Sequence, residues 1–161
     1  AINWNEPLEP ATLGLATIRL ASQPQLAGIK HLNRLEQVLA ARERLQQSFD
    51  EMVMLDTNND VISVISGNLF VVRKGEVITP LLSASGVKGT RRHLLINDWA
   101  PALGIKVLEQ RITISSLAES DEVFYCNSLV GLRPVASFAG TRWTQWPVFT
   151  ALQALYWSGG R

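Results

Sequence analysis

Lys30 is the residue whose type and position are best suited to chemistry. It lies in a short turn between a predicted strand and a predicted helix, with Gly28, Ile29 and Leu32 close by. An amine beside apolar side chains loses part of its hydration, and this favours the neutral form that acts as a nucleophile or base. A lysine before a helix is nevertheless a solvated surface residue in most proteins, so its position alone leaves both interpretations open.

A second candidate is the glycine-rich stretch 86–89, which is followed by Thr90 and Arg91 at the start of a predicted helix. Glycines ahead of a helix allow its unpaired N–H groups to face an anion such as phosphate. An ordinary turn has the same composition, and the residues by themselves do not decide between the two. Asn127-Ser128 at the end of a predicted strand is equally open: it is either a polar ligand pair or a turn.

Other function classes are excluded or disfavoured by composition. Fifteen Lys and Arg against fourteen Asp and Glu give a formal charge of +1, so no global field indicates a nucleic-acid or membrane-surface binder. Two histidines (His31 and His93) and the lone Cys126 are too few for a metal site, and one cysteine fits a reducing, cytoplasmic compartment. No apolar run approaches the roughly 18 residues that span a bilayer.

The predicted elements form one domain of ordinary size. Residues 1–10, with Pro7 and Pro10, read as a linker before a domain over 11–158. Apolar spacing predicts strands over 12–20, 52–55, 61–65, 69–72, 77–78, 105–114 and 123–126, with those between 52 and 78 joined as an antiparallel meander. It predicts helices over 32–47 and 90–103, a short helix capped by Ser115-Ser116, and a final helix after Pro147 before a frayed tail at Gly159-Gly160. The expected class is α+β, with a curled and mostly antiparallel sheet packed against helices.

Four stretches together resemble one enzyme family. The run LAGIKHLNRLEQV over 26–38 is similar to the lysine segment of aminodeoxychorismate lyases, fold-type-IV pyridoxal-phosphate enzymes related to branched-chain and D-amino-acid aminotransferases. Three more stretches follow in the family's order, within 61–70, 86–92 and 121–129. The resemblance covers about residues 8 to 135, and only the lysine segment separates the lyases from the aminotransferases.

The resemblance implies a site and an architecture. Lys30 would form the Schiff base with pyridoxal 5'-phosphate and move the proton at the reacting carbon, while the turn at Gly89, Thr90 and Arg91 would hold the phosphate. Asn127 and Ser128 would face the substrate carboxylate. The family also implies that this chain is the large C-terminal domain, that a smaller N-terminal domain precedes it, and that the full-length protein is a homodimer acting on a small molecule.

Ser63 departs from the family. It occupies the position, counted back from Asn68-Leu69-Phe70, where most relatives place a glutamate against the cofactor's pyridine nitrogen. A hydroxyl there donates a hydrogen bond to an unprotonated nitrogen, which makes the ring a weaker electron sink. The leading hypothesis is lysis of 4-amino-4-deoxychorismate to 4-aminobenzoate and pyruvate, a step toward folate, because formation of an aromatic ring drives that reaction. The alternatives are a branched-chain or D-amino-acid aminotransferase, which Ser63 disfavours, and a non-catalytic paralogue or fragment.

Overall fold

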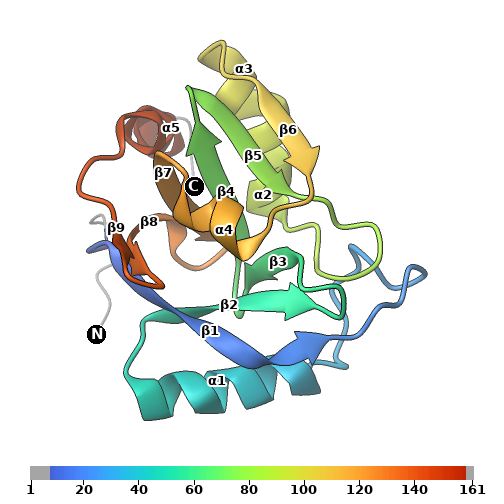
Figure 1. Cartoon of the computed structure of the whole chain (residues 1–161). Coiled ribbons are helices and arrows are strands. Elements are labelled where there is room, and N and C mark those ends of the chain that lie inside the picture. Colours follow the sequence, from blue (N-terminus) through green and yellow to red (C-terminus); the bar gives the residue numbers. More distant parts are fainter. Residues whose placement is uncertain (1–7, 159–161) are drawn as a thin grey trace.

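Nine strands join into one curled, mixed sheet in the computed structural model, which describes residues 8–158 (Figure 1). The strands are β1 (Ala11–Leu20), β2 (Glu51–Asp56), β3 (Val61–Val64), β4 (Asn68–Arg73), β5 (Glu76–Pro80), β6 (Val107–Gln110), β7 (Glu122–Asn127), β8 (Gly131–Phe138) and β9 (Thr141–Arg142). Their order is β3-β2-β1-β8-β7-β4-β5-β6, with β9 paired to β8. The pairs β1–β2, β1–β8 and β5–β6 are parallel and the other five are antiparallel. The predicted fold class, α+β with a curled and mostly antiparallel sheet, is confirmed.

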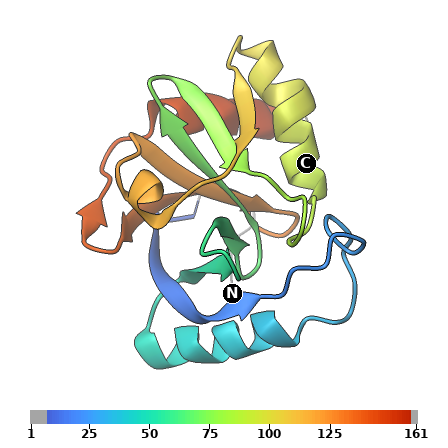
Figure 2. The ribbon, with the colours of Figure 1, turned by 45° about the vertical axis from the view of Figure 1, so that its right-hand side comes forward.

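Strand β2 shows why the sheet carries apolar side chains on both faces. All six of its residues are buried, and successive side chains of a strand point to opposite faces. Val53 and Leu55 therefore join one core cluster, whereas Met52 and Met54 join another. The second cluster lies toward α1 (Leu35–Gln47), which packs on β1 and β2 along one end of the molecule (Figure 2).

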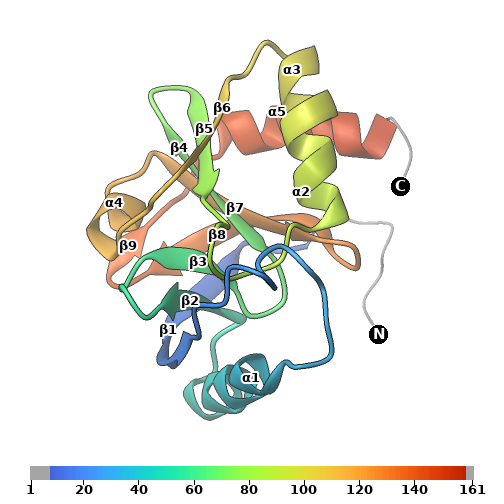
Figure 3. The same ribbon diagram turned by 90° about the vertical axis from the view of Figure 1, so that its right-hand side faces the viewer.

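A third core cluster lies under the helix that begins at Thr90 and the final helix. The segments α2 (Thr90–Leu94), η1 (Leu95–Trp99) and α3 (Ala100–Ala102) form one continuous helix with a π-helical middle, which confirms the predicted helix over 90–103. The final helix α5 (Pro147–Ser158) crosses it, as Figure 3 shows. Tyr156 meets Trp99 edge-on at 5.7 Å, and Phe70 stacks on Phe124 at 5.1 Å below. These aromatic contacts fix both helices on the sheet.

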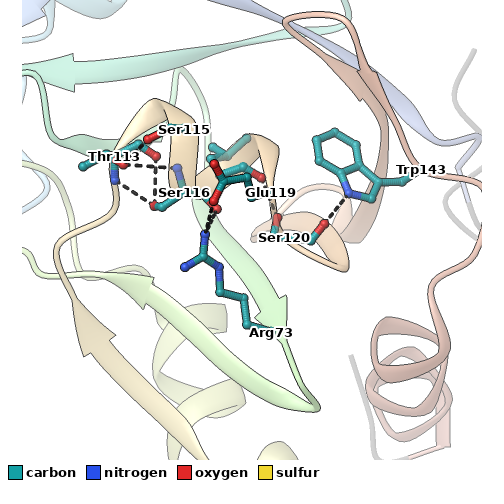
Figure 4. Close-up of polar contacts among 8 residues, drawn as sticks. Arg73, Thr113, Ser115, Ser116, Glu119, Ser120 and Trp143 are labelled. Atoms are coloured by element: carbon teal, nitrogen blue, oxygen red, sulfur yellow. Dashed lines mark hydrogen bonds and ion pairs between the residues drawn. The ribbon is translucent and has the colours of Figure 1, made fainter.

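The short helix α4 (Ile114–Ala118) is capped by Thr113 rather than by the predicted pair Ser115-Ser116. Thr113 has the extended backbone of an N-cap and exchanges side-chain hydrogen bonds with Ser116 (Figure 4). Arg73 on β4 donates to the Ser116 carbonyl, and Trp143 donates its indole N–H to the Ser120 carbonyl at 2.8 Å. These bonds tie α4 to the middle and the end of the chain.

Three more sequence predictions differ from the structure. The antiparallel pairs β2–β3 and β4–β5 of the predicted meander are confirmed, but the link between them is wrong, because β2, β1, β8 and β7 separate β3 from β4 in the sheet. Helix α1 begins at Leu35 instead of residue 32, and the strand expected over 105–114 is limited to β6. Strand β8 was not predicted, since Pro134 and Gly131 resemble strand breakers. Residues 1–7 of the predicted linker and the tail at Gly159-Gly160 lie outside the described residues.

Candidate active site

The Lys30 turn is fastened to the glycine-rich stretch by backbone hydrogen bonds. Gly28 N–H donates to the Gly86 carbonyl at 3.0 Å, and Lys88 N–H donates to the Gly28 carbonyl at 3.0 Å, which forms a short parallel bridge. Gly28 has φ +85°, and a Cβ there would lie 3.1 Å from the Lys88 side chain, so this position favours glycine. The bridge therefore places Lys30, two residues later, beside the turn that leads into α2.

Gly89 is the N-cap of α2, and no side chain caps this end of the helix. The first helical hydrogen bond runs from His93 N–H to the Gly89 carbonyl at 3.0 Å, so the amides of Thr90 and Arg91 precede the helix's own bonding pattern. Such amides face an anion favourably. The predicted phosphate turn thus has the backbone geometry that the sequence indicated.

Asn68, at the start of β4, holds this turn in place. Its Nδ2 donates to the Val87 carbonyl at 2.7 Å, and its Oδ1 accepts from Gly89 N–H at 3.2 Å. In the sequence, Asn68 stands out only as a family landmark. Its one local signal was an asparagine beginning a strand directly after Gly67.

The β7–β8 loop reaches the same turn through hydroxyl groups. Thr90 Oγ1 and Ser128 Oγ are 3.2 Å apart, and both residues are exposed. Asn127 Oδ1 accepts from the Leu129 and Val130 amides at 2.9 and 2.7 Å, and its Nδ2 donates to Ser66 Oγ at 3.3 Å. Asn127 therefore shapes the loop that carries Ser128, and Ser128 is the member of the predicted pair that faces the turn.

The two arginines that follow Gly89 have different surroundings. The Arg91 guanidinium lies 5.1 Å above the Tyr156 ring, as in a cation–π contact. Arg92 is buried and pairs with Glu109 at 2.7 Å, which anchors α2 to β6. The backbone amide of Arg91, rather than its side chain, is thus the part of the residue that is available to a ligand at the turn.

Ser63 lies on β3 where the register with β2 shifts, so that Ile62 and Ser63 together oppose Met54. Ser63 is half-buried, and its hydroxyl makes no hydrogen bond with residues 8–158. The neighbouring Ser66, in contrast, donates to the buried Glu51 carboxylate at 2.5 Å. Ser63 is therefore the hydroxyl on this strand that is free to bind a ligand.

Two expectations about individual side chains have opposite outcomes. Lys30 is exposed, and Ile29 and Leu32 are 52% and 101% exposed, so the apolar surroundings expected for the amine do not form among the described residues. Cys126 is fully buried in the core below α2, and desolvation raises the pKa of its thiol to about 12. As the sequence indicated, Cys126 is a packing residue and not a nucleophile.

Within residues 8–158 the structure has no group of three or more His, Cys, Asp or Glu side chains that could hold a metal ion. The same part of the chain contains no helix long and apolar enough to cross a membrane. The site is thus built from one lysine, a helix start and hydroxyl groups, which suits an anionic organic ligand.

Comparisons with known proteins identify the family of the chain. Residues 1–138 match the family described as amino-transferase class IV. The chain is 41% identical over 136 residues to the aminodeoxychorismate lyase of Vibrio harveyi, covering 84% of this chain and 49% of that protein. It is 33% identical over 108 residues to the branched-chain-amino-acid aminotransferase of Escherichia coli, covering 67% of this chain and 35% of that protein.

The fold is similar to that of a solved lyase. The crystal structure of 4-amino-4-deoxychorismate lyase from Pseudomonas aeruginosa superposes with a TM-score of 0.85 at 36% identity, over 94% of this chain and 54% of that one. The chain spans about half the length of these two lyases. On the match over residues 1–138, the chain belongs to the amino-transferase class IV family.

Proposed function

We propose that the protein containing this chain is a pyridoxal-phosphate-dependent lyase that converts 4-amino-4-deoxychorismate to 4-aminobenzoate and pyruvate, a step toward folate. The observation that carries the proposal is the bridge between Gly28 and the 86–88 segment, which joins the segment that carries Lys30 to the residues before an uncapped helix start. The 41% identity to an aminodeoxychorismate lyase supports the choice of reaction.

The residues present fit the cofactor. The amides of Thr90 and Arg91, with the hydroxyls of Thr90 and Ser128, would hold its phosphate. Lys30 would hold its aldehyde carbon, and the unpaired hydroxyl of Ser63 would donate to its pyridine nitrogen. When bound, pyridoxal phosphate supplies an electron-withdrawing ring that stabilises negative charge at the attached substrate carbon.

Lys30 would move the proton in this reaction. With the cofactor bound, the Lys30 amine would accept the proton from the substrate carbon that bears the amine, and the bond to the enolpyruvyl oxygen would break. Returning a proton to the departing enolpyruvyl group gives pyruvate, and the ring left behind is aromatic. Because Lys30 is exposed among the described residues, closure of the site over it falls to other parts of the protein.

Ser63 favours the lyase over an aminotransferase. A transaminase has to store negative charge on the cofactor ring until a proton returns at a different carbon, and a hydroxyl beside the pyridine nitrogen supports this less well than a carboxylate. The lyase reaction gains its driving force from aromatisation, so it tolerates the weaker sink.

The proposal includes the wider setting of the chain. Residues 11–158 would form the cofactor-binding C-terminal domain, joined by residues 1–10 to a smaller N-terminal domain, in a homodimer. The single cysteine supports a reducing, cytoplasmic location.

The test uses the full-length protein with added pyridoxal phosphate. Aminodeoxychorismate is supplied, and 4-aminobenzoate and pyruvate are measured together, with Lys30→Ala as the matched control. Equal amounts of both products that depend on Lys30 support the proposal. Transfer of the amino group from a branched-chain amino acid to a 2-oxo acid, without 4-aminobenzoate, would instead assign the aminotransferase.

A further inference from the structure

A separate cavity of about 340 Å³ lies between the β1–α1 loop, the start of α1 and the segment that leads toward α2. Figure 3 shows this loop beside that segment, and Gln23 N–H binds the Ala84 carbonyl there at 2.7 Å. None of the residues assigned above to cofactor or substrate lines the cavity. Its volume is at the lower end of the roughly 300–1,000 Å³ of small-molecule sites.

Three buried polar atoms on its walls have no hydrogen-bond partner within residues 8–158: His31 Nδ1, Gln37 Oε1 and Ser85 Oγ. They come from the loop, from α1 and from the 80–89 segment, and Ser85 is only 7% exposed. More than about 90% of buried polar groups in proteins are paired. Three such atoms in residues that line one cavity favour a polar occupant.

The charges around the cavity favour an anion. Arg34 lines it half-buried, and its guanidinium makes no hydrogen bond or ion pair with the described residues. Desolvation lowers the pKa of Arg34, and the nearby Glu36 opposes this. Glu36 is the one carboxylate among the lining residues of the described chain, and it already accepts the Ala21 amide at 2.8 Å.

The rest of the lining is largely apolar: Ile18, Leu20, Leu26, Leu35 and Leu39. We propose that the cavity binds a small, mainly apolar carboxylic acid, with its carboxylate at Arg34, a second polar contact at Gln37 or Ser85, and its apolar body against these side chains. The start of α1, which lines the cavity, has no side-chain cap, and its free amides also favour an anion. A carboxylate is favoured over a phosphate ester because the cavity has a single arginine and a largely apolar lining. The ligand would contact Ala27 and His31, which flank the Lys30 turn, so it would bind the segment that carries Lys30 from a second place.

Benzoate is the probe for the test, titrated by calorimetry into the full-length protein saturated with pyridoxal phosphate. One saturable site per chain is expected. Arg34→Met should weaken binding by at least about tenfold because a charge-assisted bond is lost, and Gln37→Leu, which keeps the side-chain volume, by about threefold to tenfold. Gln47→Leu, on the exposed side of the same helix and outside the cavity, is the matched control and should bind benzoate as the unchanged protein does.

The proposal is overturned if benzoate shows no saturable binding, or if Arg34→Met and Gln37→Leu both bind it normally. It is equally overturned if Ser128→Ala abolishes binding while Gln37→Leu does not, since benzoate then occupies the candidate active site. Gln37→Leu decides the matter where Arg34→Met fails to fold. The titration does not measure turnover. A negative result therefore overturns the cavity proposal and leaves the lyase proposal unaffected.

Discussion

Replacing Gly89 with alanine tests the architecture of the phosphate turn directly. A Cβ at this position would lie 2.4 Å from Asn68 Oδ1, far inside van der Waals contact, so the Asn68 side chain has to move. Asn68 bonds both the Val87 carbonyl and the Gly89 amide, and both bonds are lost when it moves. At about 0.5–1.5 kcal/mol each, Gly89→Ala should lower the free energy of unfolding by about 1–3 kcal/mol.

The same displacement should weaken binding of the cofactor. If the turn shifts, the amides of Thr90 and Arg91 no longer point at one phosphate position, and pyridoxal-phosphate affinity should fall by at least about tenfold, or roughly 1.4 kcal/mol. Urea unfolding measures the first effect and a fluorescence titration with cofactor the second. Gly89→Val should behave in the same direction and more strongly.

A double-mutant cycle identifies the cause. Asn68→Ala removes the colliding oxygen, so adding Gly89→Ala to that background should cost less than it does in the original protein. Gly75→Ala is the control for cofactor binding: a Cβ there meets nothing within 4 Å, so the substitution carries only the backbone strain of φ +80° and should leave pyridoxal-phosphate affinity unchanged. An undiminished cost in the Asn68→Ala background, or unchanged stability and cofactor affinity in Gly89→Ala, would refute the reasoning.

Three further predictions concern single side chains. Lys30→Ala should abolish the absorbance band of the lysine-bound cofactor and the lyase turnover of the full-length protein while leaving urea unfolding unchanged, because Lys30 is exposed; near-normal turnover contradicts its role. Ser63→Glu should raise side transamination of ordinary amino acids, measured as 2-oxo acid formation. If 2-oxo acid formation does not increase although the cofactor binds normally, Ser63 does not contact the pyridine nitrogen. For Asp50, burial raises the pKa, but hydrogen bonds from Thr12 and the Arg133 ion pair outweigh it and lower the pKa overall. Its stabilisation is therefore complete above the unfolded pKa and lost as pH falls from there through the lower folded pKa, so Asp50→Asn should flatten the acid limb of the stability curve below about pH 5; an unchanged acid limb argues against it.

The parts of the fold that depend on neighbouring residues were predictable from the sequence. Alternating or continuous apolar runs identified most strands, and the spacing of Leu35, Val38 and Leu39 identified α1. Strand pairing was not predictable in this way, because it depends on contacts between distant segments. The meander failed for this reason: β4 pairs with β7, and β2 with β1, so the link through Ser66 and Gly67 crosses between different parts of the sheet.

The candidate site shows the same contrast between features visible in the local sequence and features that depend on distant contacts. The helix start at Gly89 was visible locally, but Asn68, which locks it, belongs to another strand and becomes a site residue only through the fold. Ile29 and Leu32 also do not form the apolar surroundings expected for Lys30, because adjacency in sequence does not determine which side chains the sheet covers. Backbone bonds at Gly28 place Lys30 instead. Because a backbone bridge depends little on the side chains beside it, substitutions at Ile29 or Leu32 should disturb the position of Lys30 less than a substitution at Gly28, where φ +85° and the Lys88 side chain leave little room.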